Sequence, residues 1–273
     1  MLIDSHCHLH DKQFFTAKQA EEMVKRAHDK GVKRIICIGT DPDDSLAASE
    51  FASAHPNVYW TYGIHPEETG RVKNTLSRSI FSDGENAERP RPVTTGPRER
   101  SEKGFFTRPI AIGEVGLDYH ADGYDREAQI KLFEEMLQLS IDNDLPVSFH
   151  VRNAFPDFFA VTANFPGVRG VVHSFTDSKK TLKKILENTD FYIGVNGLAT
   201  YSTLPTPPLD RILLETDAPF LTPTPFRGII NEPGYVYEIA QWLSHKLEVD
   251  FTKIEKETTR NAERLFKFPD AVI

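Results

Sequence analysis

The chain has 273 residues, 39% of them hydrophobic and 26% charged, and a formal net charge of −8. This composition supports a large buried core and excludes a mostly disordered chain. Net acidity argues against a surface coated in positive charge to hold nucleic acid, although a locally gripped nucleic-acid substrate stays possible. The chain has no apolar run of about 20 residues and no signal peptide, so we expect no membrane contact. Its two cysteines, Cys7 and Cys37, are too few for a disulfide framework and are predicted to be buried, which favours a cytoplasmic protein.

Short apolar runs recur along the chain and predict eight strands, at residues 2–6, 33–38, 58–63, 109–113, 146–150, 168–173, 191–196 and 211–215. Several runs are apolar on both faces, which is typical of a parallel sheet covered by helices. Helical patterns separate most strands, and two more follow the last strand, near 233–248 and 252–266. We therefore predict an α/β fold of the (β/α)₈ TIM-barrel type, in a single domain over residues 1–273. The alternative is an open, doubly wound sheet.

The helical stretches are recognised by apolar residues that recur every three or four positions. The stripes are Ala20, Val24 and Ala27; then Ile130, Phe133, Leu137 and Ile141; and finally Ile254, Thr258, Ala262 and Leu265. Each stripe predicts an amphipathic helix whose apolar face packs on the sheet.

Two segments depart from this alternation. Residues 71–108 are rich in Pro, Arg, Ser and Gly, with nine Lys or Arg against five Asp or Glu. We expect a helix over 72–81 followed by a flexible, basic surface insertion, or alternatively a basic flap over a substrate. Residues 197–210, with three prolines, are the only link between the last two strands. A crossover with its helix needs at least about 10–12 residues, so either this part of the barrel is reduced or a loop is absent from the chain.

Imidazole and carboxylate side chains stand at the ends of these strands. His6 and His8 project to one face of the first strand, because successive residues of a strand alternate in direction. Later strands end in His65, Glu114, His150, His173 and Asp217. The carboxyl ends of the strands form the mouth of a TIM barrel, where such enzymes carry their catalytic residues. We therefore expect these side chains to converge.

Such a set predicts a site for two divalent metal ions. The predicted ligands are His6, His8 and Asp217 for one ion and His150 and His173 for the other, with Glu114 bridging. These ligands suit Zn²⁺, Mn²⁺, Fe²⁺ or Ni²⁺ and accept Mg²⁺ less readily, so the identity of the ions stays open. Two ions about 3.5–4 Å apart lower the pKa of a shared water and neutralise charge in phosphoester hydrolysis. Asp217 could accept the proton of that water.

Nine sequence segments resemble, in their order and spacing, those of the TatD family of metal-dependent deoxyribonucleases. They are IDSHCHLH, GIHPEE, AIGEVGLDYH, LPVSFHVRNA, GVVHSFTDS, YIGVNG, PLDRILLETDAPFLTP, RGIINEP and RNAERLF. They cover nearly the whole chain outside 71–108, and AIGEVGLDY with LLETDAPFL is highly specific to that family. The resemblance implies a TIM-barrel hydrolase of the amidohydrolase superfamily that cuts DNA phosphodiester bonds, often as a 3′→5′ exonuclease on single strands.

By position, the resemblance implies the same six metal ligands. Among them, Glu114 and Asp217 are our predicted catalytic residues. It further implies that His65 contacts a phosphate and that Arg152 holds an anion. The chain departs from the family pattern after the sixth-strand histidine, where Ser-Phe-Thr-Asp replaces Cys-Phe-Ser-Gly, and at Asn153, where Asp is common. Both departures concern the fit of the substrate rather than the ligand set.

Three functions are compared. The first is a nuclease, a monomer or weak oligomer, that binds single-stranded DNA ends through Arg152, Arg227 and the ions, with a shallow salt dependence. The second is an ester, amide or aminoacyl-ester hydrolase with the same binuclear site. The third, a non-catalytic scaffold, is disfavoured by the intact ligand set. Aromatic residues predicted near the mouth could stack on bases or simply pack at the rim; they are Tyr119, Phe175, Tyr201 and Phe220.

Overall fold

Eight parallel strands form one sheet in the computed structural model, which describes residues 1–71 and 107–269. They are β1 (Leu2–Cys7), β2 (Val32–Cys37), β3 (Val58–Tyr62), β4 (Ala111–Asp118), β5 (Val147–Arg152), β6 (Gly170–Val172), β7 (Tyr192–Val195) and β8 (Ile212–Leu214). Each strand pairs with the next along the chain. Beyond the end of β8, Ala218 forms an isolated parallel bridge with Cys7 of β1, so the barrel is nearly closed. The predicted TIM-barrel fold is confirmed, and the open doubly wound sheet is wrong.

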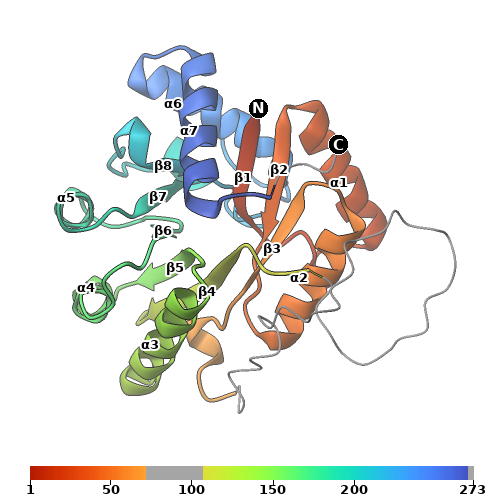
Figure 1. Cartoon of the computed structure of the whole chain (residues 1–273). Helices are drawn as coiled ribbons and strands as arrows, with labels where there is room; N and C mark the ends of the chain where they lie inside the picture. Colours follow the sequence, from red (N-terminus) through yellow and green to blue (C-terminus); the bar gives the residue numbers. More distant parts are fainter. Residues whose placement is uncertain (72–106, 270–273) are drawn as a thin grey trace, which may run out of the picture.

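Helices surround the strands (Figure 1). The helices α1 (Ala17–Asp29) and α2 (Pro42–Ala54) lie on one side of the barrel, and α3 (Arg126–Asp142), α4 (Phe155–Thr162) and α5 (Lys179–Asn188) lie on the opposite side. The last two helices, α6 (Val236–Leu247) and α7 (Phe251–Phe266), follow β8. Within the described ranges, no helix has the length and apolar character that crossing a membrane requires.

The predicted helices form where capping and apolar periodicity agree. In α1 the Thr16 side chain accepts a hydrogen bond from the Gln19 backbone N–H, and the Gln19 side-chain oxygen accepts one from the Thr16 backbone N–H. This capping box satisfies free N–H groups of the first turn. The predicted apolar stripes of α1 and α7 are buried. The stripe of α3 is only partly buried, since Ile141 in the last turn is exposed while the neighbouring Leu132 and Met136 complete the core face.

Two connections differ from an ordinary barrel repeat. Between β7 and β8 the structure contains only the short 3₁₀ helices η3 (Gly197–Thr200) and η4 (Leu209–Arg211), in agreement with the reduced link expected there. Between β3 and β4 it describes the 3₁₀ helix η1 (Pro66–Glu68). The helix expected over 72–81 and most of the predicted basic insertion lie outside the described residues.

Strand β4 runs through Asp118, five residues beyond the end that its apolar run predicts. Its extension pairs with β5, where Gly116 lies opposite His150. A Cβ atom on Gly116 would lie 2.0 Å from the His150 carbonyl oxygen, and the residue has a φ of +149°, so glycine is required at this point. The close approach of the two backbones brings acids of β4 within reach of the histidine of β5.

Candidate metal centre

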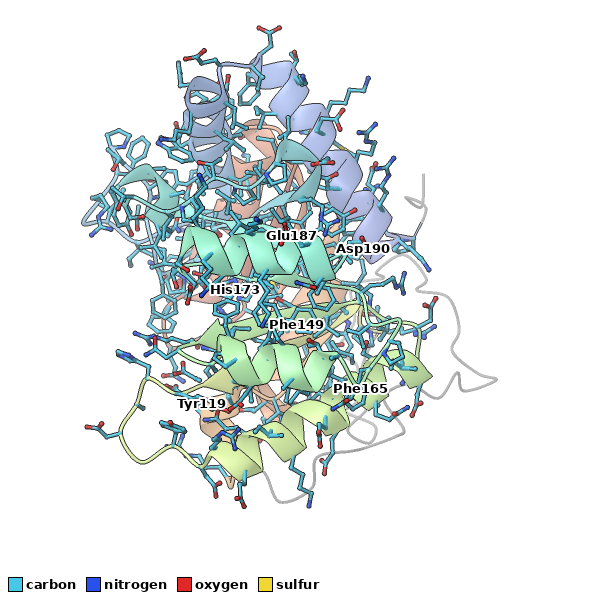
Figure 2. The ribbon with its side chains drawn as sticks, turned by 90° about the vertical axis from the view of Figure 1, so that its left-hand side faces the viewer. Tyr119, Phe149, Phe165, His173, Glu187 and Asp190 are labelled. Carbon is cyan, nitrogen blue, oxygen red and sulfur yellow. The ribbon has the colours of Figure 1, made fainter. Side chains whose placement is uncertain are left out.

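A cavity of about 690 Å³ opens at the carboxyl ends of the strands. Figure 2 shows the barrel from the side: Tyr119 and His173 lie toward one end, while Phe165 and Asp190 lie toward the other. The cavity lies at the end marked by His173, which is one of its lining residues. The other candidate residues that line it are His8, His65, Glu114, His150, Arg152 and Asp217.

The two histidines of β1 and its extension face two carboxylates. His6 Nε2 lies 3.5 Å from Glu114 Oε2 and 3.7 Å from Asp217 Oδ1. His8 Nε2 lies 3.9 Å and 3.5 Å from the same two oxygen atoms, and 3.3 Å from His6 Nε2. The alternation of side chains along β1 therefore places both imidazoles on one face, as predicted.

The histidines after β5 and β6 face the other oxygen of the same glutamate. His150 Nδ1 lies 2.6 Å from Glu114 Oε1, and His173 Nε2 lies 3.8 Å from it. His173 Nε2 is also 3.9 Å from Asp217 Oδ2, and the His173 ring stacks on His6 with 3.5 Å between centroids. Glu114 thus presents one carboxylate oxygen to each pair of histidines, which is the geometry that a bridging ligand needs.

The separations of these atoms fit the dimensions of a metal site. Ligand atoms about 2.1 Å from a tetrahedral ion lie about 3.4 Å from one another. The contacts among His6, His8, Glu114 and Asp217 range from 3.3 to 3.9 Å. A mixed set of imidazoles and carboxylates also has the donor chemistry of Zn²⁺ or Mn²⁺. The residues therefore fit a divalent cation.

Three clusters in the described residues have the spacing of metal ligands. They are His6 with His8 and Glu114, His6 with His173 and Glu215, and His65 with Asp118 and His150. The first is part of the predicted ligand set. The second and third each include an acid that was not predicted as a site residue, so the structure adds two carboxylates to the candidate centre.

Each added carboxylate lies behind a histidine. Asp118 Oδ2 is 2.8 Å from His150 Nε2, and Glu215 Oε1 is 3.1 Å from His173 Nδ1, so both acids face the ring nitrogen that points away from Glu114. Ligating histidines usually have such a partner, which fixes the ring and makes the ligand nitrogen more basic. The sequence contained one indication of Asp118: it lies four residues after Glu114, so in a strand the two side chains point to the same face.

The histidines oppose the effect of burial on the two central acids. Burial alone would raise the pKa of Glu114, but hydrogen bonds with His150 and His6 hold that pKa well below its ordinary value. Burial also acts to raise the pKa of Asp217, and the charge of His173 with a hydrogen bond from His8 lowers it. Both carboxylates are therefore ionised at neutral pH.

Two of the histidines bind protons strongly. Burial would lower the pKa of His150, but hydrogen bonds to Asp118 and Glu114 raise it to about 9. Burial likewise acts to lower the pKa of His173, and the charges of Glu215 and Asp217 raise it to about 10. A cation bound here must displace these protons, because a histidine ligand coordinates in its neutral form.

The two predicted substrate contacts lie at the edge of this centre. His65 Nε2 is 3.8 Å from Glu114 Oε1, and burial lowers the pKa of His65 to about 4. Its Nδ1 accepts a hydrogen bond of 3.3 Å from the Glu67 backbone N–H. Arg152, at the end of β5, is exposed and lines the cavity.

The four aromatic residues predicted near the mouth have different surroundings. Phe175 is buried, and Tyr119 stacks on Tyr124. Tyr201 is exposed but lies beneath the Arg227 guanidinium, 3.7 Å from its ring centre. Phe220 is 46% exposed and lines the cavity, so it is the one member of this set that offers an aromatic surface to the cavity.

Comparison with known proteins adds a family to this geometry. A family model described as "TatD related DNase" matches residues 3–267. An uncharacterized metal-dependent hydrolase of Bacillus subtilis, YabD, is 32% identical, and the alignment covers 98% of this chain and 99% of that protein. The 3′-5′ ssDNA/RNA exonuclease TatD of Erwinia billingiae is 31% identical, with 93% and 95% covered.

A solved structure agrees in fold. The crystal structure of YjjV, a TatD homologue from Escherichia coli K12, superposes with a TM-score of 0.79 at 26% identity and covers 98% of each chain. The family model spans the barrel from β1 through α7 and therefore includes every candidate site residue. The chain belongs to the TatD-related DNase family.

Proposed function

We propose that this chain is a metal-dependent hydrolase that cleaves phosphodiester bonds at the ends of single-stranded DNA. The observation that carries the proposal is the position of Glu114, whose two carboxylate oxygens face two different pairs of histidines. The relatives named as metal-dependent hydrolases and as single-strand exonucleases support the same class of reaction. The proposed ligands are His6, His8, Glu114, His150, His173 and Asp217.

Bound divalent ions such as Mg²⁺, Mn²⁺, Zn²⁺ or Ni²⁺ would supply a water of lowered pKa and would neutralise charge on the phosphate. Asp217 is assigned the role of proton acceptor, because it is ionised at neutral pH and lines the cavity. Its φ of +59° is unusual for a residue other than glycine, and such backbone strain is often found at functional positions.

His65 is suited to donate a hydrogen bond to a phosphate oxygen. Its low pKa keeps the ring neutral at pH 7. Because Nδ1 accepts from the Glu67 backbone, the single proton of the neutral ring lies on Nε2, the nitrogen that faces Glu114. A neutral donor at this point can orient a phosphate oxygen and adds no charge to the centre.

Arg152 is assigned to the phosphate of the neighbouring nucleotide. Its guanidinium group always carries charge and can bind two phosphate oxygens at once. It is the only Lys or Arg among the described residues that line the cavity. A single cationic contact favours a short grip on a strand end over a long footprint.

The test is digestion of single-stranded DNA labelled at either the 3′ or the 5′ end, with each divalent ion supplied separately. We expect a ladder that shortens from one end. Glu114→Ala should abolish digestion and reduce the bound metal measured by mass spectrometry, while Glu255→Ala, on the distant helix α7, serves as the control. Turnover of a model carboxylic ester with every DNA left intact would replace this proposal by ester hydrolysis, and retained digestion by Glu114→Ala would contradict the bridging role.

A further inference from the structure

Two phenylalanine rings stand exposed at the rim of the cavity. Phe14 is 44% exposed and Phe220 is 46% exposed, and their ring centres lie 5.3 Å apart in an edge-to-face arrangement. Of the exposed large apolar side chains in the described part of the chain, these two alone line the cavity. Exposed aromatic surface beside a polar site is costly in water and is a common mark of a binding surface.

The backbones that carry these rings are fixed. Phe220 N donates to Asp217 O over 2.8 Å, and Phe220 O accepts from the side chain of Asn231, which is fully buried. Phe14 N donates to Asp11 O, and the next residue, Phe15, is anchored in the core. The rings are thus presented by rigid turns, which reduces the entropy that a ligand loses on binding them.

The pair adjoins the candidate metal centre. The Phe220 ring centre lies 6.5 Å from the His8 ring centre, and Phe220 follows Asp217 by three residues in the same turn. A phosphodiester held at this centre would therefore place the base of an adjoining nucleotide near the two rings. Because the two ring planes are 82° apart, that base can stack on the face of one ring while the other ring contacts it at an edge.

The charge of the cavity also favours stacking over a basic groove. Besides Glu114 and Asp217, the lining residues include five acids, namely Asp11, Asp44, Glu67, Glu68 and Asp118, whereas Arg152 is the one Lys or Arg among them. These acids oppose the close approach of a long polyanion. Contacts that do not depend on charge must then contribute to the grip on a nucleotide, and base stacking on aromatic rings is such a contact.

We propose that Phe14 and Phe220 form a stacking platform for an unpaired nucleobase adjoining the scissile phosphate. This inference rests on the proposed nuclease function and names the feature of the substrate that the site reads. A base inside a duplex has both faces covered by its neighbours, so the platform selects unpaired ends. Each stacked base is worth about a 5- to 150-fold gain in binding, whatever its identity.

The experiment pairs ring removal with base removal. Phe220→Ala, Phe14→Ala and the double variant are compared with wild type on a single-stranded oligonucleotide and on versions with an abasic residue on either side of the terminal phosphodiester bond. We expect wild type to prefer the intact strand at least fivefold in kcat/KM over one abasic version. The three alanine variants should lose that preference, whereas Phe220→Trp, which keeps an aromatic ring, should retain it.

Controls separate this inference from the proposed function. Tyr124→Ala removes an exposed aromatic ring that does not line the cavity, and it should keep the preference for a base. If wild type cleaves none of the strands, the nuclease proposal fails. If wild type cleaves intact and abasic strands equally, or the variants slow all strands by one common factor, the platform is overturned while the nuclease proposal stands.

Discussion

Replacing Glu215 by Gln tests whether the carboxylate behind His173 controls cation binding. Glu215 is fully buried, and its Oε1 lies 3.1 Å from His173 Nδ1, 2.7 Å from the Ser174 backbone nitrogen and 3.2 Å from Asn196 Nδ2. A Cβ atom at Gly194 would lie 2.3 Å from Glu215 Oε2, so the carboxylate fills its space closely. Glutamine has nearly the same shape, and it removes the charge while replacing one carboxylate oxygen by an NH2 group.

The expected loss of metal affinity follows from the contact between Glu215 and His173. Loss of a charged partner behind a ligating histidine weakens metal binding about 10- to 100-fold, which is about 1.4–2.7 kcal/mol. The partner of His6 is a neutral group, because Ser148 Oγ lies 3.3 Å from His6 Nδ1. We therefore expect Ser148→Ala to weaken binding less than Glu215→Gln does.

Titration calorimetry with Mn²⁺ and Zn²⁺ measures both affinities directly, without reference to turnover. Thermal melts of the metal-free proteins establish that each variant is folded. Asp118→Asn provides a second case, since Asp118 Oδ2 lies 2.8 Å from His150 Nε2 and should matter to a similar degree. The reasoning is refuted if Glu215→Gln binds both ions within twofold of wild type, or if Ser148→Ala costs as much.

Two further predictions concern the frame of the site. Gly116→Ala should separate β4 from β5, because its Cβ would lie 2.0 Å from the His150 carbonyl oxygen. We expect the free energy of unfolding in urea to fall by about 3 kcal/mol and metal binding to be lost. The control is Gly167→Ala, at a residue with a positive φ but no atom nearby, and an equal loss of stability there would contradict the steric argument. The imidazole of the buried His10 lies 2.9 Å from the partly exposed carboxylate of Asp44. Burial acts against the charge of both groups, but the hydrogen bond between them raises the pKa of His10 to about 10 and lowers that of Asp44 to about 2. The stabilisation from this pair should be complete between about pH 4 and 6.5 and should be lost as the pH falls through 2 or rises through 10. With a chelator present at pH 5.5, Asp44→Asn should therefore be about 2 kcal/mol less stable than wild type. A stability difference that persists at pH 10.5 would count against this pairing.

The convergence of the candidate ligands could be predicted because it depends on two simple regularities. Side chains alternate along a strand, which puts His6 and His8 on one face, and the carboxyl ends of parallel strands meet at one end of a barrel. Neither regularity requires knowledge of distances between residues. Both held in the structure, where His6 Nε2 and His8 Nε2 lie 3.3 Å apart.

The partners behind the histidines could not be predicted in the same way. Strand β4 continues through Gly116 to Asp118, but glycines inside an apolar run also mark strand ends, and only the pairing with β5 shows that the ladder continues. Glu215 and Asp217 are two residues apart, so alternation alone would place both on one face. Strand β8 ends at Leu214 and the backbone is left-handed at Asp217, so the alternation does not continue to Asp217. A residue pattern does not reveal which of the two acids faces the cavity.

The charges at the mouth require a cation of some kind in every state of the protein. Glu114 is buried, the Asp217 side chain is only 15% exposed, and both are ionised. A carboxylate withdrawn from water is tolerated only when it is paired. In the metal-free chain this role falls to protons on His150 and His173, whose pKa values are about 9 and about 10. Cation binding should therefore release protons and should strengthen as pH rises toward those values. This balance would serve any hydrolase with the same centre, so the selection of a nucleic-acid end must come from groups outside it, and Phe14 and Phe220 at the rim are placed to provide that selection.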